Sequence, residues 1–257
     1  MDFNLGSVEN DIARAKAFFM SGGSFGVLEK LGSGEEGQVR AFGDAAVKEY
    51  WQMPKLAIFN SDLWQEKMLK QSEKGMKREI NFAPVLSTEV LWQSASKGKL
   101  LTFAPRLHGS KLVNRDWNAT TDELAENFRG IANVGVDGLE KFFEDCHQIS
   151  GIGFYTDFGA RDNFILTNSK EGERHISIID YRLPEIATKP SPEDRQAINA
   201  DALRLILGAK LGCTRHVISD IKEVYGEVLN NAEKALSRIR YSDDAKIDLN
   251  AFKDLLR

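Results

Sequence analysis

The sequence predicts an α+β protein with two lobes: a small lobe rich in strands with one helix, then a mainly helical lobe. Two observations predict this order. Residues 27–51 and 82–107 contain short apolar stretches separated by turn residues, which is typical of strands and hairpins. After residue 112, apolar residues recur mainly at helical spacing. A chain of 257 residues is long enough to give both lobes a buried core.

The first lobe is expected to hold about five strands. Glycines interrupt the first three strands at residues 32–37 and at Gly43-Asp44, a pair that favours a tight hairpin turn. Pro54 is well placed to start the helix, because proline is tolerated in a first helical turn. The expected elements are a short amphipathic helix over residues 8–19, three strands over 27–51, one helix over 55–74, and strands over 82–93 and 99–107.

The second lobe is expected to contain a single β-hairpin near its start, formed by "NFIL" and "HISIID" around a polar turn. The remaining segments have the apolar periodicity of helices. The expected helices cover residues 121–131, 138–149, 192–211, 217–240 and 249–256.

The composition excludes several classes of protein. A net charge of −4 gives no overall basic field, so we expect no nucleic-acid partner. No stretch reaches the roughly 18 apolar residues of a membrane helix, and the N-terminus lacks a secretory signal pattern. The two cysteines, Cys146 and Cys213, are far apart and suit a reducing compartment. We expect a monomer in the cytoplasm, or in a host cytosol if the protein is a secreted effector.

A glycine-rich segment, Gly32-Ser33-Gly34-Glu35-Glu36-Gly37, is the first candidate for a functional site. Such a segment alone is weak evidence, because glycines also serve ordinary turns. A dinucleotide-binding fold would place a helix after it, whereas strands follow here. A glycine-rich hairpin over the phosphates of ATP requires strands, and also a lysine on the third strand, where Lys48 lies.

With these features the sequence resembles the protein-kinase-like superfamily, in particular the compact atypical kinases of bacterial effectors and phages. The resemblance implies a bilobal kinase-like fold with an N-terminal helical extension over residues 1–25, an ATP-binding lobe over 26–106 and a catalytic helical lobe over 107–257. It also implies ATP and Mg²⁺ as cofactors. The implied ATP-binding residues are Gly32, Ser33, Gly34, Gly37, Val39, Ala46, Lys48 and Phe103.

The resemblance further implies a glutamate, on the helix after the third strand, that pairs with Lys48. Glu66 lies in this helix near Leu63 and Leu69, and Glu73 is the alternative. Either residue could instead be a solvated surface charge, which is the usual place of a helical glutamate.

Residues 155–166, "YTDFGARDNFIL", contain two overlapping motifs. If the letters DFG marked a magnesium site, a catalytic loop should precede them, but residues 136–153 have the apolar face of a helix instead. The resemblance therefore favours Asp157 as the base that accepts the proton of the substrate hydroxyl. It makes Asn163 and Asp180, at the end of "HISIID", the magnesium ligands.

Several details depart from the family pattern. Asn163 follows Asp157 by six positions, where about five are usual, so Asp162 is an alternative metal ligand. Tyr155 and Thr156 replace the usual His and Arg, and no glycine follows Asp180 closely. The segment of residues 181–194 is short for an activation loop.

Two further charged residues have open assignments. Asp201 is similar to the helical aspartate that braces the catalytic loop, or is a surface charge. Arg161 binds phosphate or an acidic substrate, or is a solvated loop residue.

The sequence thus predicts an ATP- and magnesium-dependent phosphotransferase that acts on Ser, Thr or Tyr hydroxyls of a protein substrate. Three alternatives remain open: a pseudokinase that binds without turnover, a small-molecule phosphotransferase, and a transferase of AMP.

Overall fold

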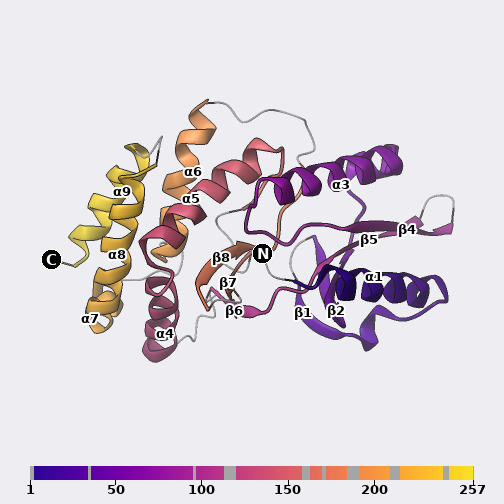
Figure 1. Ribbon diagram of the computed structural model, residues 1–257, viewed down its shortest axis with the longest axis horizontal. Coiled ribbons are helices and arrows are strands. Elements are labelled where there is room, and N and C mark those ends of the chain that lie inside the picture. The colour runs from indigo at the N-terminus through magenta and orange to yellow at the C-terminus, as the bar shows by residue number, and fades with distance from the viewer. Residues whose placement is uncertain are drawn as a thin grey trace. The chain divides into compact units, whose positions relative to one another are not determined.

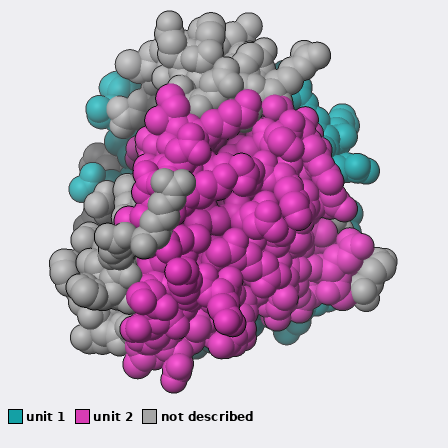
Figure 2. Space-filling model, turned by 90° about the vertical axis from the view of Figure 1, so that its left-hand side faces the viewer, with its two compact units in different colours: residues 1–79, 83–107 teal, residues 80–82, 108–257 magenta. Residues whose placement is uncertain are grey.

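The computed structural model describes residues 3–33, 36–94, 97–112, 120–157, 163–169, 172–183, 192–208, 215–239 and 243–256. Figure 1 traces the chain and labels its elements. The chain divides into two compact units. Unit 1 comprises Met1–Glu79 and Ala83–Leu107, and unit 2 comprises Ile80–Phe82 and His108–Arg257 (Figure 2). Among the described residues, no helix has the length and apolar character needed to span a membrane.

Unit 1 contains an antiparallel sheet with the strand order β1-β2-β3-β5-β4, which confirms the roughly five strands expected from the sequence. Gly43, with a φ of 60°, turns the chain between β2 and β3 in a conformation that favours glycine. The strands are β1 (Glu29–Ser33), β2 (Gly37–Phe42), β3 (Ala45–Tyr50), β4 (Ser87–Ser94) and β5 (Lys97–Pro105).

Helix α1 (Leu5–Met20) belongs to the core of unit 1. It packs against β3 and β5 and is followed by the short 3₁₀ helix η1 (Phe25–Val27). The Asp11 carboxylate accepts a hydrogen bond of 2.8 Å from the backbone N–H of Asp44, which fixes α1 to the turn after β2. One apolar cluster joins α1 and η1 to the sheet, and its buried members are Val8, Ile12, Ala15, Phe19, Phe25, Ala45, Val47, Leu101 and Phe103.

Two helices, α2 (Lys55–Phe59) and α3 (Ser61–Lys77), occupy the segment where the sequence predicted one. Asn60 interrupts them with an extended backbone, and its side chain accepts a hydrogen bond of 2.9 Å from the backbone N–H of Leu63. Asparagine is a preferred N-cap residue, so it starts a new helix here in place of continuing the first. The expectation of one uninterrupted helix was therefore wrong. The buried residues of α3 are Trp64, Met68, Ser72 and Gly75.

Unit 2 contains a three-stranded antiparallel sheet with the order β6-β7-β8. Strands β7 (Phe164–Asn168) and β8 (Arg174–Ile178) form the predicted hairpin, and β6 (Gly109–Lys111) adds a strand that the sequence did not predict. At Gly109 a Cβ atom would lie 2.1 Å from the backbone oxygen of Leu166, so this close pairing requires glycine.

The helices of unit 2 surround a core rich in aromatic residues. Phe128 packs edge-on against Tyr225, and Phe142 packs edge-on against Phe164 of β7. Helix α5 contacts α6, α8 and β8, while α4 contacts α8 and α6 contacts α9. The predicted helix over residues 217–240 is divided at Ile221 into two. The helices are α4 (Thr121–Ala132), α5 (Gly135–Gly151), α6 (Pro192–Ile206), α7 (Arg215–Asp220), α8 (Lys222–Leu236) and α9 (Asp243–Asp254).

The short segment Ile80–Phe82 belongs to unit 2, although unit 1 precedes and follows it in the chain. Its Asn81 donates a backbone hydrogen bond of 3.1 Å to the buried Asp145 carboxylate of α5 and accepts one of 2.9 Å from the N–H of Ile178. Phe82 packs against the rings of Phe154 and Tyr181. Three residues thus form an integral part of the core of unit 2.

Candidate active site

The glycine-rich turn is attached to strand β3. The backbone oxygen of Glu36 accepts a hydrogen bond of 2.9 Å from the N–H of Trp51, which extends the β2–β3 ladder by one bond. At Gly37, a Cβ atom would lie 2.2 Å from the backbone oxygen of Glu49, so only glycine allows this approach. Gly32 and Ser33 end β1, whereas Gly34 lies outside the described residues.

Lys48 projects from the face of the sheet opposite to α1. Its neighbour Val47 is buried in the cluster under α1, and successive side chains of a strand point to opposite faces. Val39 and Thr102 lie directly across from Lys48 on β2 and β5, so they share its face. Ala46, two residues before Lys48, shares this face as well.

Phe103 lies on the other face. It pairs with Val47 in the sheet, and its side chain is fully buried in the cluster under α1. Its backbone oxygen accepts a hydrogen bond of 2.8 Å from the N–H of Leu86. The structure thus separates the side chain of Phe103 from those of Val39, Ala46 and Lys48.

The ammonium group of Lys48 lies beside the glycine-rich turn. Its Nζ is 3.4 Å from the Oε2 of Glu36 and 4.9 Å from the centre of the Tyr50 ring. The side chain of Lys48 is 13% exposed and that of Glu36 is 31% exposed, so the pair is partly buried. The sequence analysis did not predict that Glu36 pairs with Lys48, although Glu36 lies within the glycine-rich segment.

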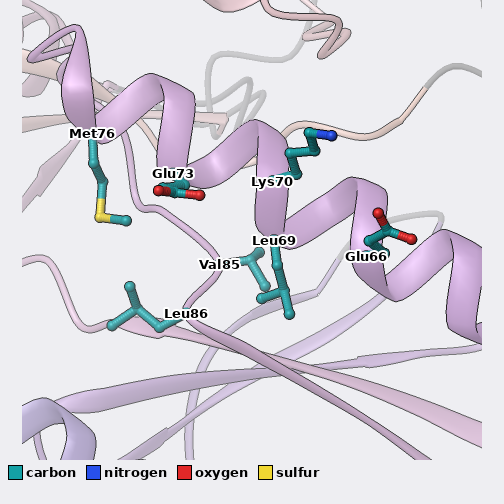
Figure 3. A pocket seen from close by; sticks show the side chains of 7 residues that line it. All are labelled: Glu66, Leu69, Lys70, Glu73, Met76, Val85 and Leu86. Carbon is teal, nitrogen blue, oxygen red and sulfur yellow. The ribbon is translucent and has the colours of Figure 1, made fainter.

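Glu66, the expected partner of Lys48, lines an open groove along α3 with a volume of about 520 Å³ (Figure 3). The view shows Leu69 pointing toward Val85, with Glu66 one turn away on the same helix. No hydrogen bond or ion pair joins the side chain of Glu66 to any other residue that the structure describes. The alternative, Glu73, pairs with Lys77 at 2.6 Å, and this hydrogen bond lowers the pKa of Glu73.

In unit 2, Asn163 connects the two candidate aspartates. Its side-chain Nδ2 donates a hydrogen bond of 3.1 Å to the backbone oxygen of Asp157. Its own backbone oxygen accepts hydrogen bonds from the N–H groups of Ile179, at 2.8 Å, and Asp180, at 3.4 Å. The structure therefore brings Asp157, Asn163 and Asp180 together through bonds to the backbone.

The segments that lead to the two aspartates also pair with each other. Tyr155 and Arg182 exchange backbone hydrogen bonds of 2.8 and 2.9 Å in an antiparallel bridge. The guanidinium of Arg182 lies 5.0 Å from the centre of the Tyr155 ring. Each aspartate lies two residues from this bridge, Asp157 after it and Asp180 before it in the chain. The bridge thus fixes both segments next to each other.

The end of helix α5 directs the chain into this bridge. Gly153, with a φ of 95°, follows the last helical turn, and its N–H donates to the oxygen of Ser150 at 3.0 Å. The N–H of Phe154 donates to the oxygen of Ile149 at 3.1 Å. A glycine in the left-handed region is a common helix C-cap. The Gly-Ile-Gly segment therefore stops the helix and positions Asp157 shortly after it.

The donor atoms near Asn163 fit a magnesium ion. The Nδ2 of Asn163 donates to the backbone oxygen of Asp157, so the side-chain atom of Asn163 that could serve as a ligand is Oδ1. The second candidate ligand, Asp180, bonds to Asn163 through its backbone N–H. Oxygen ligands suit a hard cation that keeps several waters. Asp162, the alternative ligand, lies outside the described residues, and within the described part no group of three or more His, Cys, Asp or Glu could hold a metal ion.

Asp201 forms an ion pair with Arg204 at 2.8 Å, and Arg204 also contacts Asp248 of α9 at 2.8 Å. This network of α6 and α9 favours the interpretation of Asp201 as a surface charge. Arg161 and Cys213 lie outside the described residues, whereas Cys146 is a free and buried thiol.

No protein-family model and no curated protein sequence matches the chain. Among solved structures, the chain is similar to "WaaP in complex with acyl carrier protein", with a TM-score of 0.41 and 12% sequence identity. The similarity covers 86% of this chain and 88% of that chain. The element order itself, a five-stranded antiparallel sheet with its helices followed by a mainly helical part, is the one that the kinase-like resemblance predicts.

Proposed function

We propose that this protein is an ATP- and magnesium-dependent phosphotransferase that transfers the γ-phosphoryl group to a hydroxyl of a protein substrate. The observation that supports this most is the set of bonds from Asn163 to the backbones of Asp157 and Asp180. These bonds hold a candidate base and the candidate metal ligands in one rigid arrangement. Phosphoryl transfer depends mainly on such positioning and on neutralisation of negative charge.

The residues of the chain have distinct tasks in this reaction. The exposed carboxylate of Asp157 accepts the proton of the acceptor hydroxyl as the hydroxyl oxygen bonds to the γ-phosphorus of ATP. The bond between that phosphorus and the bridging oxygen breaks at the same time, and ADP leaves. Asp180 and the Oδ1 of Asn163 would hold magnesium, and Lys48 would donate charged hydrogen bonds to phosphate oxygens. Bound Mg-ATP supplies the phosphoryl group and offsets the charge on its oxygens.

A protein acceptor is favoured by the exposure of Asp157, since a base at the surface of its unit can be reached by a side chain of another protein. Small-molecule phosphotransferases of this fold usually have a His-x-Asp triplet, and Tyr155-Thr156-Asp157 stands here instead. The loss of that triplet also motivates the second candidate, a pseudokinase that binds nucleotide without turnover.

A labelling experiment tests the proposal. The protein is incubated with Mg²⁺, a cell extract as the source of acceptors, and ATP labelled at either the γ- or the α-phosphate. Asp157→Ala is the control, and it keeps the bond from Asn163 because that bond ends on the backbone oxygen of residue 157. We expect protein-bound γ label that is at least about 100-fold weaker with the control.

The other outcomes are equally decisive. Label from the α-phosphate alone indicates AMP transfer and contradicts the proposal. Bound nucleotide without transfer of either label indicates a pseudokinase. Label that appears only on small molecules of the extract keeps the phosphotransferase activity and rejects the protein acceptor.

A further inference from the structure

We infer that Glu36 of the glycine-rich turn is the residue that positions Lys48, in place of a glutamate from helix α3. The inference rests on the proposed function, because it assigns Lys48 to the phosphates of ATP. It concerns residues of unit 1 alone, and it makes the turn responsible both for covering the phosphates and for orienting the lysine that contacts them.

The backbone of the turn gives Glu36 a fixed starting point. The oxygen of Glu36 accepts the N–H of Trp51 at 2.9 Å, and Gly37 lies so close to β3 that a Cβ atom would collide with the oxygen of Glu49. The backbone of Glu36 therefore lies close to the end of β3. The sheet thus holds the backbone of Glu36 in place, and the Oε2 of its carboxylate lies 3.4 Å from the Nζ of Lys48.

The aromatic ring of Tyr50 supports the same lysine. The Nζ of Lys48 lies 4.9 Å from the centre of this ring, within the range of cation–π attraction. Tyr50 is itself held by Trp64 of α3, whose ring lies edge-on at 6.0 Å. Helix α3 thus supports Lys48 through an aromatic contact, and the turn contributes a negative charge beside Lys48.

The direction of Glu66 agrees with this assignment. Trp64 belongs to the buried face of α3, and Glu66 is two residues further, about 200° around the helix at 3.6 residues per turn. By this helical geometry Glu66 points away from Trp64. Figure 3 shows Glu66 with Leu69 and Val85 along the groove.

A double-mutant cycle on nucleotide binding tests the inference. The affinity for Mg-ATP is measured by calorimetry for the wild type, Glu36→Gln, Lys48→Met and the double variant. We expect Glu36→Gln to weaken binding about 10-fold, which corresponds to about 1.4 kcal/mol, because Lys48 loses the carboxylate that orients it. We expect no further loss in the double variant relative to Lys48→Met, because Glu36 acts through Lys48.

Glu89→Gln is the matched control. Glu89 forms an ion pair of 3.0 Å with Lys16 in the same unit, and the two side chains are 33% and 27% exposed, similar to the Glu36–Lys48 pair. We expect this variant to bind Mg-ATP like the wild type. A normal affinity of Glu36→Gln together with a reduced affinity of Glu66→Gln would overturn the inference. So would an effect of Glu36→Gln that persists unchanged in the Lys48→Met background.

The same four variants are also compared by urea unfolding without nucleotide. A coupling free energy between residues 36 and 48 shows that the pair exists in the free protein. If the wild type binds no Mg-ATP, the proposed function fails and the nucleotide role of Glu36 fails with it. If the wild type binds Mg-ATP but neither cycle shows coupling, only the assignment of Glu36 fails.

Discussion

The two units hold their candidate site residues by different means. In unit 2, Asn163 is bonded to the backbones of Asp157 and Asp180, and a backbone bridge at Tyr155 aligns the segments that carry them. In unit 1, Lys48 is held by a side-chain ion pair and an aromatic ring. Backbone bonds follow from the course of the chain, whereas a side-chain pair depends on which neighbour reaches the ammonium group. The second kind of contact is therefore harder to predict from a sequence.

Asn163→Ala is expected to have the largest effect. It removes the bond to the Asp157 oxygen and a proposed metal ligand together, so we expect phosphoryl transfer to fall by about 100-fold or more in the labelling assay. Asn163→Asp keeps a side-chain oxygen that can bind the metal, but it cannot donate the hydrogen bond to Asp157. An intermediate rate for this variant would separate the contribution of metal binding from that of the hydrogen bond. Asn168→Ala, at the exposed end of the same strand, is the control and should keep its rate. Equal rates for Asn163→Ala and this control would show that the side chain of Asn163, with its bond to the Asp157 oxygen, is not important for transfer.

Gly37→Ala tests the backbone of the turn in unit 1. The added Cβ would lie 2.2 Å from the backbone oxygen of Glu49, so β2 and β3 must separate locally. We expect a loss of about 2 kcal/mol in the free energy of unfolding in urea, as for other overpacked sites. Gly26→Ala is the control, because its Cβ would meet only the Oγ of Ser24 at an ordinary 3.6 Å. A wild-type stability of Gly37→Ala would show that the turn is not held tightly against β3.

Asp145→Asn is expected to have the smallest effect. It changes how the free energy of unfolding depends on pH. Burial raises the pKa of the Asp145 carboxyl above its ordinary value, although Lys141 and the N–H of Asn81 oppose this. The folded protein therefore binds this proton more tightly than the unfolded chain does. As the pH rises from about 4 through the raised pKa, the contribution of Asp145 to stability falls.

The amide of Asp145→Asn retains an acceptor for Asn81 without a titrating charge. The wild type should thus lose stability relative to this variant as the pH rises above about 4, measured by urea unfolding at several pH values. A constant difference between the two proteins above this pH would show that burial does not govern the charge of Asp145.

Sequence patterns predicted the strands of unit 1 well, because glycine turns and apolar alternation mark strand ends locally. They did not predict β6, since three residues carry no periodicity and its pairing depends on the close approach at Gly109. The break at Asn60 was missed because the apolar pattern continues across it.

In the candidate site, too, the sequence predicted some features and missed one that depends on a contact between side chains. The grouping of Asp157, Asn163 and Asp180 was expected from the order of helix, turn and hairpin, although their roles stay predictions. Glu36 was passed over, because reach between side chains across a turn leaves no repeating pattern in the chain.

The assignment of Ile80–Phe82 to unit 2 has a practical consequence. The chain passes from one unit to the other at residues 79/80, 82/83 and 107/108. A fragment that starts at residue 108 would lack the ring of Phe82, which packs against Phe154 and Tyr181. It would also lack the backbone N–H of Asn81, which donates a hydrogen bond to the Asp145 carboxylate. Cutting the chain between residues 107 and 108 therefore does not yield two complete units. Unit 2 needs residues 80–82, which lie between the two segments of unit 1 in the sequence, to complete its core.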